Sequence, residues 1–261
     1  MIAPNAIPHD AIPHDAIPFD DRGLLLGEGL FETLLALDGE VRHLDAHLDR
    51  MAGGCAVLGL PFDRAEAEGL CRRMIPATGR VALRLTLTGG SGGRGLDRPA
   101  DQAPRLFARA APVAPVTTPA RAVLSTVRRN EGSPASRLKT LAYVDSVLAR
   151  AEAVAAGADE ALMLNNRGEL VCGAAANLFW VADGRLFTPA LHCGVLPGIT
   201  RARLLAAQAV EEVAVGPEAL DGVEAVFLTN SLIGLRPVSR LGERAFEPHP
   251  LVERLRAALP A

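Results

Sequence analysis

The sequence is poor in several features that mark particular classes of protein. Its four cysteines show no CxxC spacing and are too few for a disulfide scaffold in a chain of 261 residues, which indicates reduced thiols and a cytoplasmic protein. Its apolar runs are no longer than a strand, so we expect no membrane span. The formal net charge is −3, and this lack of a basic excess argues against nucleic acid as a partner. The N-terminus lacks a basic stretch followed by an apolar one, and we therefore expect no signal peptide.

Lysine is the rarest charged residue, because only one of the 27 Lys and Arg residues, Lys139, is a lysine. An arginine-rich composition explains why lysine is rare, but not why one lysine remains. Arginine cannot lose its proton in a protein or act as an amine nucleophile, whereas a buried lysine can do both. Lys139 is therefore a candidate for carbonyl chemistry, and the alternative is a chance survivor on a solvated helix face.

The pattern of strands and helices predicts an α+β fold with mostly antiparallel sheets in two domains. Hairpins are expected at Asp38-Gly39, within 160–171 and at Asp183-Gly184. Helices are expected over 45–58 with Asp45 as the cap, 63–75, 139–157, from Gly198 to 213, and 248–259.

Residues 113–120 are rich in Pro, Ala and Thr and show no periodicity, which predicts a linker. It would separate an N-terminal α+β domain, residues 1–112, from a C-terminal domain, residues 121–261. The repeat A-I-P-[HF]-D at residues 6–20 contains a proline in every copy, which forbids a helix, and we interpret it as a mobile tail or edge segment. This interpretation includes His9 and His14, which we do not assign to a metal site.

Three short motifs could contact a ligand. The segment GGSGGRG at 89–95 lacks the lysine of a phosphate loop and is interpreted as a flexible loop, in which Arg94 could meet a carboxylate. The helix start at Gly198 and the strand end at 229–231 both suit anions. His43 and His47 have helical spacing without a third ligand, so we expect helix-surface histidines and no metal site.

Five segments, in register over about residues 19–240, resemble the fold-type IV (class IV aminotransferase) pyridoxal-phosphate enzymes. That family includes branched-chain and D-amino-acid aminotransferases and 4-amino-4-deoxychorismate lyase. The segments are DRGLLLGEGLFETLLALDGEVRHLDAHLDRM, LKTLAYVDSVLARAEAVAAGADEALMLNNRGELV, AAANLFWV, GVLPGITR and FLTNSLIGLRPV. The resemblance implies a two-domain fold like that of D-amino-acid aminotransferase, pyridoxal 5'-phosphate bound by the C-terminal domain, a small-molecule substrate and a homodimer.

The resemblance also implies roles for individual residues. Lys139 matches the lysine that forms a Schiff base with the cofactor and then moves protons on the substrate. The residues that match cofactor-phosphate contacts are Arg50, Ile199, Thr200 and Ser231, where Ser231 replaces a threonine and Asn230 precedes it.

Two positions depart from the family pattern. Phe31 stands where D-amino-acid aminotransferases carry a tyrosine. Cys172, counted back from Asn177, stands where the family has the glutamate that pairs with the cofactor ring nitrogen. A neutral thiol supports a protonated ring less than a carboxylate does, which disfavours transamination more than elimination. Glu169 could substitute, but strand alternation points it to the opposite face.

The segments GGSGGRGL and AAANLFW resemble 4-amino-4-deoxychorismate lyase most closely. We therefore favour a lyase that eliminates pyruvate and forms 4-aminobenzoate, with Arg84 or Arg94 facing substrate carboxylates. A branched-chain or D-amino-acid aminotransferase and a non-catalytic cofactor-binding homologue remain as alternatives.

Overall fold

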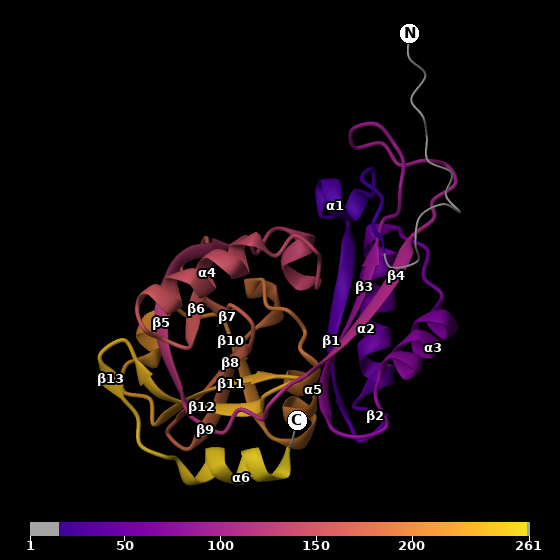
Figure 1. Cartoon of the computed structure of the whole chain (residues 1–261). Coiled ribbons are helices and arrows are strands. Elements are labelled where there is room, and N and C mark those ends of the chain that lie inside the picture. Colours follow the sequence, from indigo (N-terminus) through magenta and orange to yellow (C-terminus); the bar gives the residue numbers. More distant parts are fainter. Residues whose placement is uncertain (1–15, 260–261) are drawn as a thin grey trace.

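The chain forms two sheets that lie beside one another, each with its own helices (Figure 1). This computed structural model describes residues 16–259, so the expectations for His9, His14 and the first two copies of the repeat lie outside the described residues. Mixed helices and mostly antiparallel strands confirm the α+β class.

The smaller sheet comes from the N-terminal part of the chain and has the antiparallel order β2-β1-β3-β4. Its elements are α1 (Arg22–Leu26), β1 (Gly29–Leu37), β2 (Glu40–Val41), α2 (Leu44–Leu58), α3 (Arg64–Met74), β3 (Arg80–Thr88) and β4 (Arg105–Pro112). Leu34 and Leu83 point to the side that α2 covers, where they pack with Leu48 and Met51. Because side chains alternate along a strand, Phe31 and Arg84 point to the other side of this sheet.

The larger sheet has the order β10-β9-β8-β11-β12-β5-β6-β7, with β13 paired to β12. Its strands are β5 (Ala120–Arg129), β6 (Glu160–Asn165), β7 (Leu170–Gly173), β8 (Asn177–Ala182), β9 (Arg185–Pro189), β10 (Val210–Val213), β11 (Ala225–Asn230), β12 (Gly234–Leu241) and β13 (Arg244–Ala245). Its helices are α4 (Val144–Ala155), α5 (Ile199–Ala207) and α6 (Pro250–Ala258). A further pairing of Cys172 with Asn177 joins β7 to β8 and closes six of these strands into a ring.

The two sheets meet where the segment before α4 runs along the edge of β1. The Phe31 N–H donates to the Lys139 carbonyl at 2.9 Å, and the Leu141 N–H donates to the Gly29 carbonyl at 3.0 Å. The helix predicted over 139–157 is therefore wrong at its start: α4 begins at Val144, because residues 139–141 use their backbone groups in this pairing.

Three other expectations need correction. Asp45 is not the cap of α2, since His43 holds that position in a left-handed conformation and no side chain caps the helix. The helix after Gly198 ends at Ala207, and residues 210–213 form edge strand β10 beside β9. Strands β12 and β13 lie in a stretch for which no element was expected. The linker at 113–120 stays a prediction; residues 113–119 contain no helix or strand.

Among the described residues, none of the helices combines the length and apolar character needed to cross a membrane.

The core of the smaller sheet supports a stability prediction. Leu83 is fully buried beneath α2 and α3, so Leu83→Ala should lower the free energy of unfolding by about 2–5 kcal/mol through lost burial and a residual cavity. Val57 on α2 is 60% exposed, and Val57→Ala is the matched control, with a change within about 0.5 kcal/mol. Urea denaturation followed by circular dichroism measures both, and equal effects would contradict the assigned core.

Candidate functional site

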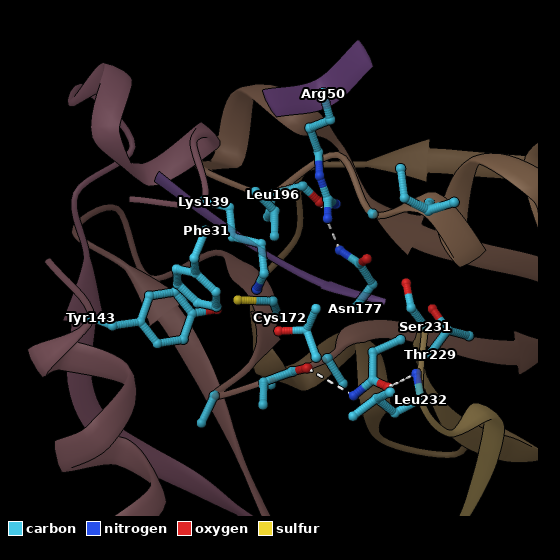
Figure 2. A pocket seen from close by; sticks show the side chains of 18 of the residues that line it. Phe31, Arg50, Lys139, Tyr143, Cys172, Asn177, Leu196, Thr229, Ser231 and Leu232 are labelled. Atoms are coloured by element: carbon cyan, nitrogen blue, oxygen red, sulfur yellow. Dashed lines mark hydrogen bonds between the residues drawn. The ribbon is translucent and has the colours of Figure 1, made fainter. Parts of the chain in front are cut away.

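A cavity of about 280 Å³ lies where the two sheets meet (Figure 2). Its lining comes from β1, α2 and β3 of the smaller sheet, from the 138–143 segment, and from the loops at one end of the strand ring. The charged lining residues are Arg50, Arg84, Arg129 and Lys139, and the described lining contains no carboxylate. The cavity is therefore built to hold an anion.

Lys139 points its amine into this cavity from the segment that pairs with β1. Its Nζ lies 4.2 Å from the centre of the Phe31 ring and 5.1 Å from the centre of the Tyr143 ring. Burial lowers the pKa of Lys139 from 10.5 to about 8, and the charges of Arg50, Arg84 and Arg129 act in the same direction against the opposing effect of Glu32. The deprotonated form, which a nucleophile or a proton acceptor requires, is consequently far more populated near neutral pH than it is for a lysine of ordinary pKa.

Arg50 reaches the cavity from α2 and is held there by a buried carboxylate. Glu32, 1% exposed, accepts from Arg50 Nε at 2.8 Å and from Nη2 at 2.6 Å, and Arg50 Nη1 donates to the Pro197 carbonyl at 3.0 Å. Burial opposes ionisation of Glu32, but hydrogen bonds from His47 and Arg50 outweigh it and hold the pKa of this carboxyl below its usual range. This bidentate ion pair with Glu32 fixes the plane of the Arg50 guanidinium, which faces the cavity.

His47 extends this network to the opposite sheet. It is fully buried, its Nδ1 lies 2.7 Å from the Glu32 carboxylate, and its Nε2 lies 3.2 Å from Ser231 Oγ. The expectation of a helix-surface histidine was therefore wrong for His47. The His47 ring therefore connects the Glu32 carboxylate to the Ser231 hydroxyl, so one carboxylate orients Arg50 directly and Ser231 through His47.

The start of α5 supplies backbone donors to the cavity. Gly198 is the N-cap, and no side chain caps this helix, so the N–H groups of Ile199 and Thr200 remain available to an anion. Gly198 must be a glycine, since an added Cβ would lie 1.9 Å from Asn177 Oδ1. Asn177 in turn donates to the Leu196 carbonyl at 2.9 Å and fixes the loop before the helix.

The end of β11 lines the side of the cavity that faces Lys139 across it (Figure 2). Thr229 is 1% exposed, and its hydroxyl has no hydrogen-bond partner among the described residues. Asn230 is occupied structurally, because its oxygen accepts from the Leu232 and Ile233 N–H groups and its amide donates to the Ala175 carbonyl. Thr229 therefore leaves a buried hydroxyl for a ligand, at the strand end that the sequence indicated for anions, although this residue is buried and not at an exposed tip.

Cys172 lines the cavity from β7 and is 5% exposed. Desolvation raises the pKa of its thiol, so the side chain is neutral at physiological pH. Glu169 does not replace it: its carboxylate accepts from Asn165 Nδ2 at 2.6 Å and Arg167 Nη2 at 2.7 Å, and it lies outside the cavity lining.

The arginines named as substrate candidates differ in position. Arg84 lines the cavity, and its guanidinium carbon lies 3.8 Å from the centre of the Phe31 ring. Desolvation lowers the pKa of Arg84, and among the described residues no carboxylate is in contact with it. Arg94, in contrast, is exposed in the loop between β3 and β4 and does not line this cavity.

Sequence reasoning missed Glu32, Arg129 and Tyr143. Glu32 was detectable as the one charged residue inside the apolar strand β1. Arg129 donates to the Gly194 carbonyl at 3.2 Å and to the Ser136 carbonyl. It thereby connects the segment before Lys139 to the loop before α5. Tyr143 packs edge-on against Phe31. Arg129 and Tyr143 belong to the site through long-range contacts, which leave no pattern in the local sequence.

The cavity provides what pyridoxal 5'-phosphate, the cofactor implied by the resemblance, needs in order to bind. Its aldehyde requires a deprotonatable amine, which Lys139 offers. Its phosphate requires a cation and N–H donors, which Arg50 and the start of α5 offer. The unpartnered Thr229 hydroxyl is available to a ligand oxygen. Cys172 is the departure, because it brings no charge to the ring. Among the described residues no group of three acidic, His or Cys side chains is placed to hold a metal.

Comparison with known proteins agrees with this assignment. Residues 29–241 match the model of the amino-transferase class IV family. A protein of Methanocaldococcus jannaschii, named provisionally as a branched-chain-amino-acid aminotransferase, is 33% identical over 86% of this chain and 82% of its own. The aminodeoxychorismate lyase of Bacillus subtilis is 27% identical over 85% of this chain and 80% of its own. The crystal structure of 4-amino-4-deoxychorismate lyase from Pseudomonas aeruginosa is 32% identical, with a TM-score of 0.86, over 94% of this chain and 95% of that one.

The pKa of Lys139 leads to a direct test on the protein without added ligand. We expect the rate of Lys139 acetylation to rise with pH, with its midpoint at about pH 8, because only the deprotonated amine reacts. Arg84→Met removes a nearby positive charge and should move the midpoint upward. Peptide mass spectrometry reads this single lysine separately from the N-terminal amine. A midpoint near 10.5 in the unaltered protein would contradict the burial and charge assigned to this amine.

Proposed function

This chain belongs to the class IV aminotransferase family of pyridoxal-phosphate enzymes, and from that premise we propose that it is a 4-amino-4-deoxychorismate lyase. The observation that carries the proposal is the charge of the cavity: besides Arg50, which we assign to the cofactor phosphate, the lining presents Arg84 and Arg129, and its described residues include no carboxylate. Aminodeoxychorismate brings two carboxylates, whereas a branched-chain amino acid brings one and an apolar side chain.

The cofactor and the side chains would each perform part of the reaction. When bound, pyridoxal phosphate condenses with a primary amine and withdraws electrons from the carbon that carries it. Lys139 Nζ, deprotonated and within the cavity, accepts the proton from that carbon of the substrate. The C–O bond at the neighbouring carbon then breaks, and the departing enolate takes up one proton, in exchange for the one that Lys139 accepted, to become pyruvate. Formation of the aromatic ring of 4-aminobenzoate drives the release.

Three contacts support substrate and cofactor orientation. Arg50, held by Glu32, and the N–H groups at the start of α5 bind the cofactor phosphate. Arg84, which has no carboxylate partner within residues 16–259, binds a substrate carboxylate while its guanidinium stays on the Phe31 ring. Phe31 and Tyr143 form an apolar wall beside Lys139 that suits a planar carbocycle.

An aminotransferase is the second candidate, and the similarity to the Methanocaldococcus jannaschii protein favours it. Transamination requires the proton to return to the cofactor, a step that a charged partner of the ring would assist. Cys172 is neutral and buried, so the side chain at this position would give the ring nitrogen no ion pair, and the lack of that direct contact disfavours transamination more than elimination.

We further propose that the chain forms a homodimer through α1 and the start of α4. The two helices lie near one another, since a Cβ added at Gly27, directly after α1, would lie 3.3 Å from the Ala142 Cβ, two residues before α4. Together they expose six large apolar side chains: Leu24, Leu25 and Leu26 of α1 and Val144, Val147 and Leu148 of α4. An exposed apolar cluster of this kind is typical of an interface between subunits.

The reaction can be tested with the purified protein. Incubation with aminodeoxychorismate should release pyruvate and 4-aminobenzoate in equal amounts without an amino acceptor, as measured by lactate dehydrogenase coupling and fluorescence. Lys139→Arg should reduce the rate by at least about 1,000-fold, because guanidinium cannot exchange a proton at this pH. Rapid conversion of amino acid and keto acid pairs, with no pyruvate from aminodeoxychorismate, would instead establish the aminotransferase.

Carboxylate recognition by Arg84 can be tested separately. Arg84→Met should raise KM about tenfold and change kcat less, since loss of one charge-assisted hydrogen bond weakens binding by about 1.5–3 kcal/mol. Arg73→Met on α3, outside the cavity lining, is the control and should leave both constants unchanged. An unaltered KM in Arg84→Met would remove Arg84 from the substrate site.

A further inference from the structure

A second buried carboxylate lies behind the wall of the cavity and takes no part in the contacts described so far. Glu160 begins β6 and is 7% exposed. Its Oε1 accepts from the Ala174 N–H at 2.9 Å and from the Ala161 N–H at 3.0 Å, and the Ala175 N–H also bonds to this carboxylate. Ala174 and Ala175 both line the cavity, while Glu160 itself does not. The carboxylate is therefore one backbone thickness away from the ligand space.

The sequence of the wall accommodates this carboxylate. A Cβ on Gly173 would lie 2.9 Å from both Cγ and Cδ of Glu160, so only glycine leaves room for the acid at this point. This wall, residues 173–175, has no polar side chain and forms its hydrogen bonds with groups outside it, among them the Ala176 carbonyl, which accepts from the Gly173 N–H at 2.7 Å. On the other side, Asn230 donates to the Ala175 carbonyl at 3.0 Å. The wall is thus fixed from both sides, by Glu160 and by Asn230.

The ionisation of Glu160 depends on its burial and on the charged and polar groups around it. The charged and titratable groups that act on Glu160 are Arg150 of α4 and Cys172 of β7. Burial raises the pKa of Glu160, but the backbone N–H donors and Arg150 favour its ionised form. Desolvation is the main cause that raises the pKa of the Cys172 thiol; Arg129 opposes it, and the nearby Glu160 carboxylate acts in the same direction as desolvation.

We propose that Glu160 is a positioning residue of the cofactor site, which fixes the wall at residues 173–175 and supplies from behind it the negative potential that no lining side chain provides. The proposal rests on the cofactor of the family and is independent of whether the reaction is elimination or transamination. Its failure therefore leaves the lyase proposal in place, and the reverse also holds.

The charge is tested by Glu160→Gln, which keeps an oxygen acceptor and removes the charge. Glu169→Gln is the matched control, because it removes a carboxylate from the same β6–β7 hairpin at a position outside the cavity lining. In the protein without cofactor, Glu160→Gln should speed alkylation of Cys172 by iodoacetamide at pH 8 about three- to tenfold, since the thiol pKa falls when a nearby negative charge is removed. Peptide mass spectrometry distinguishes Cys172 from the other three cysteines.

The same pair of variants is then compared with the cofactor bound. Glu160→Gln should lower, by about one pH unit, the midpoint at which the visible absorption band of the holoenzyme changes, because a positive charge on the bound cofactor loses its counter-charge. Glu169→Gln should leave it unchanged. If Glu160→Gln lowers the melting temperature but alters neither the alkylation rate nor the absorption midpoint, Glu160 acts only in packing and the proposal is wrong.

The shape of the wall is tested by a double variant. Gly173→Ala should weaken pyridoxal-phosphate binding at least about tenfold in equilibrium dialysis, because the new Cβ meets Glu160 and displaces the wall. Combining it with Glu160→Ala removes the collision and should recover part of that loss. Unchanged affinity in Gly173→Ala, or equal losses in the single and double variants, would contradict the role of Glu160 in fixing this wall.

Discussion

The structure depends on two main-chain hydrogen bonds that join residues 139–141 to the edge of β1. They carry the catalytic candidate on a segment that belongs to neither sheet, and they place its amine in the cavity between the sheets. Phe31 takes part twice, through its N–H to the Lys139 carbonyl and through its ring beside the Lys139 amine. Backbone and side-chain geometry at this point are consequently coupled, and the cavity exists only while the two sheets stay joined.

Around this joint, charge is distributed unevenly. The cations face the cavity, whereas the acids that balance them stand behind it: Glu32 holds Arg50, and Glu160 lies behind the wall at residues 173–175. This separation leaves an anionic ligand as the natural partner of the lining. It also accounts for the low pKa of Lys139, since a buried amine surrounded by guanidinium groups binds a proton weakly.

Much of the fold could be predicted because its signals are local. The hairpins at Asp38-Gly39 and Asp183-Gly184 and the helix capped by Asp63 follow from turn and capping chemistry within a few residues. The start of α4 could not be predicted, because helical periodicity in 139–143 is overridden by pairing with a strand a hundred residues earlier. The same limit applies to His47, whose position on α2 was visible, but whose burial depends on Glu32 and Ser231. Lys139, in contrast, was identified from the rarity of lysine in the sequence, which requires no knowledge of local or long-range contacts.

The way in which Lys139 is held has a chemical consequence. Its segment is fixed by backbone amides, which every residue type at 139 would still provide, rather than by the amine itself. Truncation of the side chain to alanine would thus leave the surrounding residues in place. It would open a space about as long as the side chain of lysine, next to the Phe31 ring. A small alkylamine from solution could occupy that space and stand in for the missing group, so the scaffold and its base are separable components.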